Sequence, residues 1–194
     1  MRIVAGAWRG RTIEAPRSDA TRPTADRVRQ AVFDMLSHAP WADPLEGCAV
    51  LDGFAGSGAL GLEALSRGAA RAVFFETDRD ALDSLRANIA TLGAASRCCV
   101  MPADTRRPRH ATAELGGCGL VFLDPPYARD LIAPALAALR TAGWIAGDAV
   151  IVAETGRDEA PPVAPDRLLA ERQHGAARIS VSYTHLTLPT ICSV

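Results

Sequence analysis

Four acidic residues of the 194-residue chain stand at or near the ends of short apolar runs that are typical of buried strands. They are Asp52, Glu76, Asp104 and Asp124. In an open parallel sheet, ligands bind beyond the carboxyl ends of the strands, where such side chains come together. One acid at a strand end is ordinary loop chemistry. Four in succession predict a site for a ligand that carries hydrogen-bond donors or positive charge.

A glycine-rich turn follows the first of these acids. Segment 50–61 reads Val-Leu-Asp-Gly-Phe-Ala-Gly-Ser-Gly-Ala-Leu-Gly and passes from strand to turn to helix. Glycine permits positive φ and close approach of a ligand, and the following helix directs its N–H groups at the turn. The run from Gly56 to Gly61 matches a dinucleotide fingerprint, and Glu76 stands near the distance of a ribose-binding acid. An NAD-dependent oxidoreductase is therefore one interpretation.

Asp52 favours a cationic ligand instead, because a carboxylate at the turn repels a pyrophosphate. S-adenosylmethionine carries an ammonium, a sulfonium and a ribose. Asp52 can orient the ammonium, Glu76 can accept both ribose hydroxyls, and Asp104 can accept from the adenine amino group. The sequence thus favours S-adenosylmethionine as the cofactor, with S-adenosylhomocysteine as its product.

The motif Asp124-Pro125-Pro126-Tyr127 has the residue types needed to hold an aromatic amine. Its two prolines fix φ and remove two N–H donors, so the turn presents carbonyl groups. Asp124 and the Pro125 carbonyl can accept the two hydrogens of a nucleobase amine, which directs the nitrogen lone pair at a methyl group. Tyr127 can stack on the base, a contact worth about 1–3 kcal/mol. A base inside a duplex is out of reach, so the target must be flipped or lie in a loop.

The start of the chain is basic although the formal net charge is -1. Lysine is absent, and seven arginines precede residue 30 against three acidic residues. A basic arm on a neutral domain is a reasonable phosphate-binding footprint, with a solvated surface as the alternative. Gly10, between Arg9 and Arg11, predicts a small hairpin over residues 1–14 outside the main sheet.

The elements that would position these residues alternate between strand and helix. Apolar runs predict strands at 49–53, 72–75, 98–101, 120–123, 149–153, 168–173 and 177–183. Helices are predicted after Thr24, with Val28, Val32, Met35 and Leu36 on its apolar face, and at 57–66, 78–92 and 131–141. This alternation predicts an α/β fold with a mostly parallel seven-stranded sheet covered by helices on both faces.

Cysteine spacing and hydropathy exclude several classes of protein. The five cysteines contain no C-x-x-C pair, which favours free thiols in a reducing cytosol over disulfides or a metal site. No apolar run reaches the ~18 residues of a membrane span. Arg9 and Arg11 stand where a signal peptide would be apolar. We therefore expect a cytoplasmic protein without metal or membrane contact.

Two segments are identified by their residues: Asp52-Gly-Phe-Ala-Gly-Ser-Gly-Ala-Leu-Gly-Leu-Glu-Ala-Leu-Ser-Arg-Gly-Ala69 and Asp124-Pro-Pro-Tyr127. Both resemble motifs of the bacterial 16S ribosomal RNA guanine-N2 methyltransferases. Segments 2–11 and 22–29 are similar to the N-terminal signature of that family, and the resemblance extends to about residue 183. It implies a class I methyltransferase (Rossmann-like) fold and S-adenosylmethionine as donor. It also implies action on a guanine in a hairpin loop of 16S rRNA in an assembling 30S subunit. We expect the protein to be a monomer. Adenine-N6 methyltransferases share the second motif and remain the alternative.

Motif and resemblance together predict three groups of site residues. The catalytic group is Asp124, Pro125, Pro126 and Tyr127. The cofactor-binding group is Asp52, Gly53, Phe54, Gly56, Ser57, Gly58, Glu76, Thr77 and Asp104. The RNA-binding group is Arg9, Arg11, Arg22, Arg27 and Arg29. Residues 1–40 would form an RNA-binding hairpin and helix, 41–183 the methyltransferase domain, and 184–194, without Arg, Asp or Glu, a non-native or disordered tail.

Overall fold

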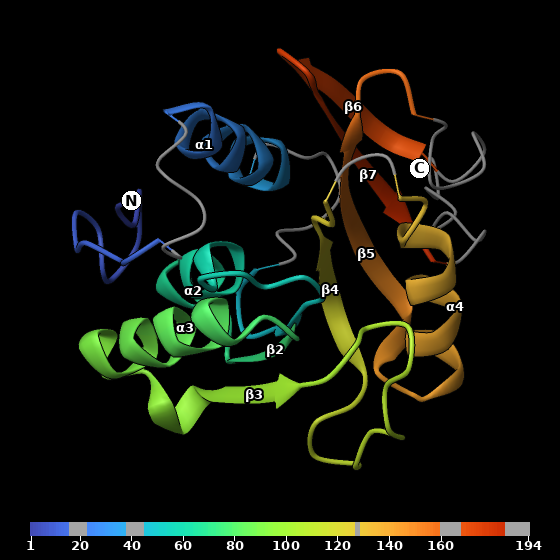
Figure 1. The fold of residues 1–194 in the computed structure, drawn as a ribbon, viewed down its shortest axis with the longest axis horizontal. Helices are drawn as coiled ribbons and strands as arrows, with labels where there is room; N and C mark the ends of the chain where they lie inside the picture. The colour runs from blue at the N-terminus through green and yellow to red at the C-terminus, as the bar shows by residue number, and fades with distance from the viewer. Residues whose placement is uncertain (16–22, 38–44, 127–128, 160–167, 185–194) are drawn as a thin grey trace, which may run out of the picture.

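A computed structural model describes residues 1–15, 23–37, 45–126, 129–159 and 168–184, and of residues 23–26 the backbone alone. Seven strands form one sheet in the order β3-β2-β1-β4-β5-β7-β6 (Figure 1). The strands are β1 Ala49–Asp52, β2 Arg71–Glu76, β3 Cys98–Pro102, β4 Cys118–Leu123, β5 Ile145–Gly156, β6 Leu168–His174 and β7 Ala177–Tyr183. The helices are α1 Pro23–Ser37, α2 Ala59–Ser66, α3 Arg79–Leu92 and α4 Ile132–Thr141, with a 3-10 turn at Ala95–Arg97.

Strands β1 to β5 run parallel, and β7 is antiparallel to both of its neighbours. The mostly parallel seven-stranded sheet predicted from the sequence is therefore confirmed. Chain order reverses between β1 and β4, which lie side by side although β2 and β3 separate them in sequence. Such a switch point is where open α/β sheets bind ligands, at the carboxyl ends of the strands.

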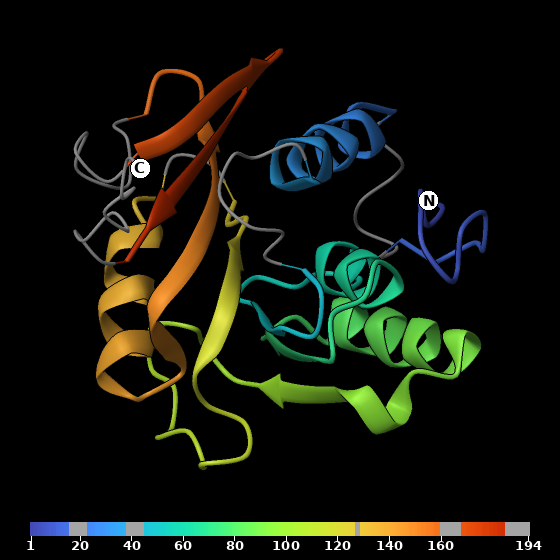
Figure 2. The ribbon, with the colours of Figure 1, turned by 180° about the vertical axis from the view of Figure 1, so that it is seen from behind.

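Alternate residues of each central strand enter two separate cores. Val50 of β1 packs into a core with α1, α2 and α3, whereas its neighbour Leu51 packs into a core with α4. Figures 1 and 2 show the same division, with α1, α2 and α3 on one side of the sheet and α4 on the other. Both faces are therefore buried, which explains why the central strands are apolar throughout instead of alternating with polar residues.

Helix α3 has the termini that its sequence predicts. Asp78 is the N-cap and accepts a hydrogen bond from the Ala81 N–H at 2.9 Å. Gly93 ends the helix with a φ of 66°, a left-handed conformation that favours glycine. The predicted apolar face of α1 is confirmed as well, since Val28, Val32, Met35 and Leu36 are all buried.

Four features differ from the sequence-based expectation. Strand β5 extends to Ile145–Gly156 because it pairs with β4 along one edge and with β7 along the other. Helix α2 begins at Ala59 because Gly58 has a φ of 82° and cannot be helical. The 3-10 turn before β3 was not expected. Thr184, assigned to the tail, donates from its N–H to the Ala149 carbonyl at 3.0 Å. Residues 185–194 lie outside the described residues.

The predicted N-terminal hairpin forms, although Arg2 and Thr12 make a single antiparallel bridge instead of a ladder. We call residues 1–15 the N-terminal arm. Ile3 and Ile13, on its two limbs, are each 1% exposed and join the core beneath α1 and α2. Burial of these two side chains, not strand pairing, gives the arm its fixed place on the domain.

Glu63 and Ser66 of α2 hold the arm by its backbone. The buried Glu63 carboxylate accepts from the N–H groups of Val4 at 2.8 Å and Ala5 at 3.0 Å. The Ser66 hydroxyl accepts from the Trp8 N–H at 3.0 Å and donates to the Ala5 carbonyl at 2.6 Å. Since these contacts use backbone groups of the arm, its exposed arginine side chains remain available for other roles.

Gly6 lies where the arm touches the end of α2. Its φ is +81°, and a Cβ atom there would lie 1.8 Å from the Ser66 carbonyl oxygen. Gly6→Ala should therefore displace the arm and lower the melting temperature by at least ~6 °C, as a loss of a few kcal/mol does in a domain of this size.

Gly10→Ala is the matched control, because Gly10 has a φ of +82° but no atom within 4 Å of its Cβ position. The backbone strain that both variants share, about 1–2 kcal/mol, should lower the melting temperature of Gly10→Ala by ~2–8 °C, less than strain and clash together do in Gly6→Ala. Thermal melts of both variants measure the difference. Equal shifts would contradict a tight contact between Gly6 and Ser66.

Candidate active site

The ends of β1 and β4 bring the glycine turn next to the Asp-Pro-Pro segment. Asp52 pairs with Phe122 in register, and the Gly53 N–H donates to the Phe122 carbonyl at 2.9 Å. A Cβ on Gly53 would lie 2.5 Å from the Leu123 Cδ2, so a larger residue there would require the Leu123 side chain to move. Asp124 follows directly after β4.

Within the Asp-Pro-Pro-Tyr motif, Asp124 and Pro126 are exposed and Pro125 is buried between them. The buried proline anchors the turn, whereas the exposed carboxylate is placed at the solvent side of the strand end. Tyr127, the predicted stacking residue, lies outside the described residues, as does Arg22 of the predicted RNA-binding group.

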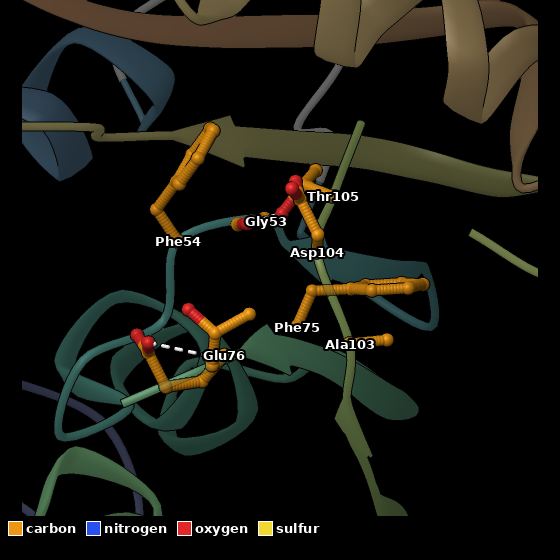
Figure 3. A pocket seen from close by; sticks show the side chains of 8 residues that line it. Gly53, Phe54, Phe75, Glu76, Ala103, Asp104 and Thr105 are labelled. Atoms are coloured by element: carbon orange, nitrogen blue, oxygen red, sulfur yellow. Dashed lines mark hydrogen bonds between the residues drawn. The ribbon is translucent and has the colours of Figure 1, made fainter. Parts of the chain in front are cut away.

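A solvent-open cavity of about 200 Å³ lies at the carboxyl ends of three neighbouring strands. Figure 3 shows its lining, contributed by the residues after β1, the end of β2 and the loop after β3. Five predicted cofactor-binding residues line it, namely Gly53, Phe54, Glu76, Thr77 and Asp104. Phe75, Ala103 and Thr105 also line it and were not predicted. Their position beside the two acids Glu76 and Asp104 was the signal available in the sequence.

Glu76 organises the glycine turn through backbone N–H groups. Its Oε2 accepts from the Gly56 N–H at 2.8 Å, and its Oε1 accepts from Thr77 at 2.6 Å and Asp78 at 2.9 Å. A carboxylate oxygen has more than one acceptor site, so a diol can still bind the half-buried group. Glu76 thus links the conformation of the turn to the wall of the cavity.

Asp104 pairs with Arg106 on the opposite wall. Its two oxygens accept from the Arg106 Nε and Nη2, the shortest distance being 2.7 Å to Nη2. These hydrogen bonds lower the pKa of Asp104 below its usual value, so the carboxylate stays ionised at neutral pH. Arg106 therefore belongs to an ion pair at the rim of the cavity.

Asp52 does not line the cavity but lies buried behind the glycine turn, 1% exposed. Its Oδ2 accepts from the Gly61 N–H of α2 at 3.0 Å. Its Oδ1 is buried and has no hydrogen-bond partner among the described residues. Burial raises the pKa of Asp52 to about 7, the Gly61 N–H opposes this shift, and the charge of Glu76 adds to it.

This raised pKa has a definite consequence for stability. Between the ordinary value of 3.8 and about 7, the folded state binds a proton that the unfolded state has lost. The contribution of Asp52 is therefore full below pH 3.8 and is lost as pH rises to about 7. We expect the free energy of unfolding of the wild type, relative to Asp52→Asn, to fall between pH 4 and pH 7 and to level off above that. Urea unfolding of both proteins across this range measures it, and parallel pH profiles would contradict the shifted pKa.

The predicted RNA-binding arginines separate into exposed and buried side chains. Arg9, Arg11 and Arg27 are exposed, and Arg11 also donates to the Thr91 carbonyl near the end of α3. Arg29 is only 3% exposed, donates to the Arg2 carbonyl at 2.6 Å and lies 3.8 Å from the Glu63 carboxylate. The prediction that Arg29 contacts phosphate is therefore wrong, because the helix periodicity turns its side chain toward α2 and the arm.

No metal site is found in the part of the chain that the structure describes, where no three His, Cys, Asp or Glu side chains cluster closely enough. Cys48, Cys98, Cys99 and Cys118 are free thiols. Burial raises the pKa of Cys98 to about 12.

None of the described helices has the length and hydropathy needed to cross a membrane.

The protein family described as "Conserved hypothetical protein 95" matches residues 1–184. Ribosomal RNA small subunit methyltransferase D of Escherichia coli K12 is 38% identical over 184 residues, covering 93% of this chain and 87% of the relative. The protein of the same name from Haemophilus influenzae is 36% identical, covering 90% of this chain and 89% of the relative.

Solved structures of methyltransferases are also similar to this chain. The Escherichia coli protein yhhF superposes with a TM-score of 0.76 at 34% identity, covering 94% of this chain and 97% of its own. The rRNA methyltransferase aviRa of Streptomyces viridochromogenes has a TM-score of 0.62 at 18% identity, covering 89% of each chain, and shares the fold. The class I methyltransferase fold predicted from the sequence is confirmed. The chain belongs to the Conserved hypothetical protein 95 family, that of Ribosomal RNA small subunit methyltransferase D.

Proposed function

We propose that this protein transfers a methyl group from S-adenosylmethionine to the N2 amine of a guanine in 16S rRNA. One observation carries the proposal: the register of β1 and β4 joins the glycine turn to the Asp124-Pro125 segment at the switch point of the sheet. A donor in the cavity and an amine at Asp124 would then be neighbours. The 38% identity to Ribosomal RNA small subunit methyltransferase D supports the substrate class.

The residues at the turn fit the donor. Asp52, whose buried Oδ1 has no partner among the described residues, would orient the ammonium group through the backbone of the turn and a water. Glu76 would take the ribose hydroxyls and Asp104 the adenine amino group, each from its own wall of the cavity. Bound S-adenosylmethionine supplies an electrophilic methyl group on a positively charged sulfur.

Asp124 and Pro125 would hold the acceptor. The carboxylate and the Pro125 carbonyl accept the two hydrogens of the guanine amine, so the nitrogen becomes pyramidal and its lone pair points toward the donor. Once it has accepted the methyl group, the amine nitrogen would carry one proton in excess, and Asp124, which is exposed to water, would take that proton. Alignment of the reactants supplies much of the rate, since holding them together removes an entropic cost.

Arg9, Arg11 and Arg27 would contact the RNA phosphates, because their side chains are exposed on the arm and on α1. The guanine must leave its stack to reach Asp124. We propose that the enzyme works as a monomer on the assembling 30S subunit in the cytoplasm, where this RNA is made.

Removing the arm charges should change the salt dependence of RNA binding. Replacing Arg9 and Arg11 with Gln should weaken binding and reduce the slope of log K against log salt by about two, one per lost phosphate contact. Binding of 16S rRNA at several salt concentrations measures the slope. An unchanged slope would exclude both residues from the RNA interface, and Arg157→Gln, an exposed charge after β5, is the control.

Transfer of labelled methyl groups tests the function itself. The protein is incubated with tritiated S-adenosylmethionine and small subunits, large subunits or naked 16S rRNA. We expect label in the 16S rRNA of the small-subunit reaction and none in the large subunit. Calorimetric titration separates the alternative cofactor, since S-adenosylmethionine should bind and NAD should not. Binding of NAD alone would support the oxidoreductase instead.

A further inference from the structure

We propose that Asn88 is a positioning residue that ties the N-terminal arm to the glycine turn, so that donor binding and RNA binding favour each other. The inference rests on the proposed function, because it takes the arm as the RNA contact and the turn as the donor contact. It concerns a residue of α3 that lies in neither the cavity lining nor the Asp-Pro-Pro segment.

The side-chain amide of Asn88 bridges two segments that are more than 40 residues apart in sequence. Its Nδ2 donates to the Glu14 carbonyl at 2.9 Å and to the Ser57 carbonyl at 3.0 Å. Its Oδ1 accepts from the Glu14 N–H at 2.7 Å. Both amide hydrogens are used, and Asn88 is 1% exposed, so water does not replace these bonds.

On the donor side, Asn88 completes the support of the glycine turn. Ser57 is held by Asn88 from α3, and the adjacent Gly56 is held by Glu76 from the end of β2. Two consecutive residues of the turn are thus fixed by two different elements, β2 and α3. The loss of either support leaves the turn with more conformations to lose when the donor binds.

On the arm side, Asn88 fixes both backbone groups of Glu14. Glu14 adjoins the buried Ile13, and Arg11 is bound to the Thr91 carbonyl on the same helix. The part of the arm that carries Arg9 and Arg11 is therefore seated on α3 at two places, and one of them is the residue that also holds the donor turn. When either the arm or the glycine turn becomes more rigid, the Asn88 side chain transmits the effect to the other segment.

Asparagine is the residue that satisfies this site. Aspartate has the same shape but cannot donate, so its carboxylate would face the Glu14 and Ser57 carbonyl oxygens inside a buried site. Alanine removes all three bonds. The bridge therefore depends on the amide itself and not on the volume of the side chain.

Coupling through such a bridge is reciprocal. A donor that fixes Ser57 holds the amide in the orientation that retains Glu14, and RNA that fixes the arm holds the amide in the orientation that retains Ser57. We therefore expect S-adenosylhomocysteine to bind about fivefold more tightly to the wild type when 16S rRNA is present.

The test compares Asn88→Ala with Ser66→Ala. Ser66 also binds the arm by hydrogen bonds but does not contact the glycine turn in any described interaction, so its variant loosens the arm alone. Calorimetry gives the Kd of S-adenosylhomocysteine with and without RNA, and the methyl-transfer assay gives KM for RNA and kcat.

For Asn88→Ala we expect the Kd of S-adenosylhomocysteine and the KM for RNA each to rise about tenfold. The gain in affinity from RNA should disappear, while kcat at saturation stays within about threefold because Asp124 and Pro125 are unchanged. For Ser66→Ala only the KM for RNA should rise. The proposal would be overturned if the Kd of S-adenosylhomocysteine were unchanged in Asn88→Ala. It would also be overturned if that Kd rose as much in Ser66→Ala as in Asn88→Ala.

A measurement on the wild type keeps the test valid if Asn88→Ala does not fold. Addition of S-adenosylhomocysteine should slow hydrogen exchange of the Glu14 N–H several-fold, since that group donates to Asn88. Unchanged exchange at Glu14 would refute the bridge. Failure of the proposed function would give a different result from failure of the Asn88 bridge. In that case the wild type would bind S-adenosylhomocysteine but transfer no label to small subunits.

Discussion

Replacing Asp124 with alanine should reduce kcat for methyl transfer about a thousandfold or more, as the loss of a group aligned with the transition state does. Asp124 follows β4 at the switch point, next to the turn that would hold the donor. Its carboxylate would accept one hydrogen of the target amine and stabilise the charge that develops on nitrogen. The buried Pro125 keeps the turn in place without it, so the Kd of S-adenosylhomocysteine should stay within about twofold.

Two further variants sharpen this result. Asp124→Asn keeps an acceptor oxygen without the charge and should retain a small part of the activity. Asp148→Ala removes an exposed carboxylate near the start of β5, at the end of the parallel strands opposite Asp124, and should leave kcat unchanged. Full activity of Asp124→Ala would remove the residue from the catalytic step. A parallel loss of donor binding would make its role one of folding instead.

Replacing Glu76 with alanine should weaken donor binding about a hundredfold, because one carboxylate would serve two purposes there. It accepts from the N–H groups of Gly56, Thr77 and Asp78 and so fixes the turn. It also lines the cavity, where the ribose hydroxyls would bind it. Calorimetry with S-adenosylhomocysteine measures the loss without requiring RNA.

Glu76→Gln separates these two purposes. The amide oxygen can keep the backbone bonds of one carboxylate oxygen, but the neutral group is a weaker acceptor for hydroxyls, so the loss should be about tenfold. Asp80→Asn, an exposed acid in the first turn of α3, is the control and should bind as the wild type does. Unaltered affinity in Glu76→Ala would place the ribose elsewhere.

Much of the fold followed from local patterns of sequence. Apolar runs located all seven strands, and the helix predicted at 78–92 agrees with α3 to within one residue. These signals are strong because each reflects a local requirement: burial on both faces of a strand, or satisfaction of the N–H and carbonyl groups at a helix end. The extra length of β5 had no such signal, since it arises from pairing with β7, which is distant in sequence.

The candidate site shows where sequence reasoning stops. The sequence shows that acidic residues follow successive strands, but it does not show in which direction each side chain points. Glu76 and Asp104 line the cavity, whereas Asp52 turns inward to support α2. Helix periodicity separates the buried Arg29 from the exposed Arg27, but its partners, the Arg2 carbonyl of the arm and Glu63 of α2, could not be read from the sequence. The bridge through Asn88 joins three segments whose proximity is a property of the assembled fold.

The identity of the methylated nucleoside tests the central claim most directly. Small ribosomal subunits that lack the modification are incubated with the protein and labelled S-adenosylmethionine. Their 16S rRNA is then digested, and the labelled nucleoside and its oligonucleotide are identified by mass spectrometry. We expect N2-methylguanosine at a single position in a loop of the 16S rRNA, lost in Asp124→Ala. Label in N6-methyladenosine, or no transfer to 16S rRNA by a protein that binds the donor, would contradict the account.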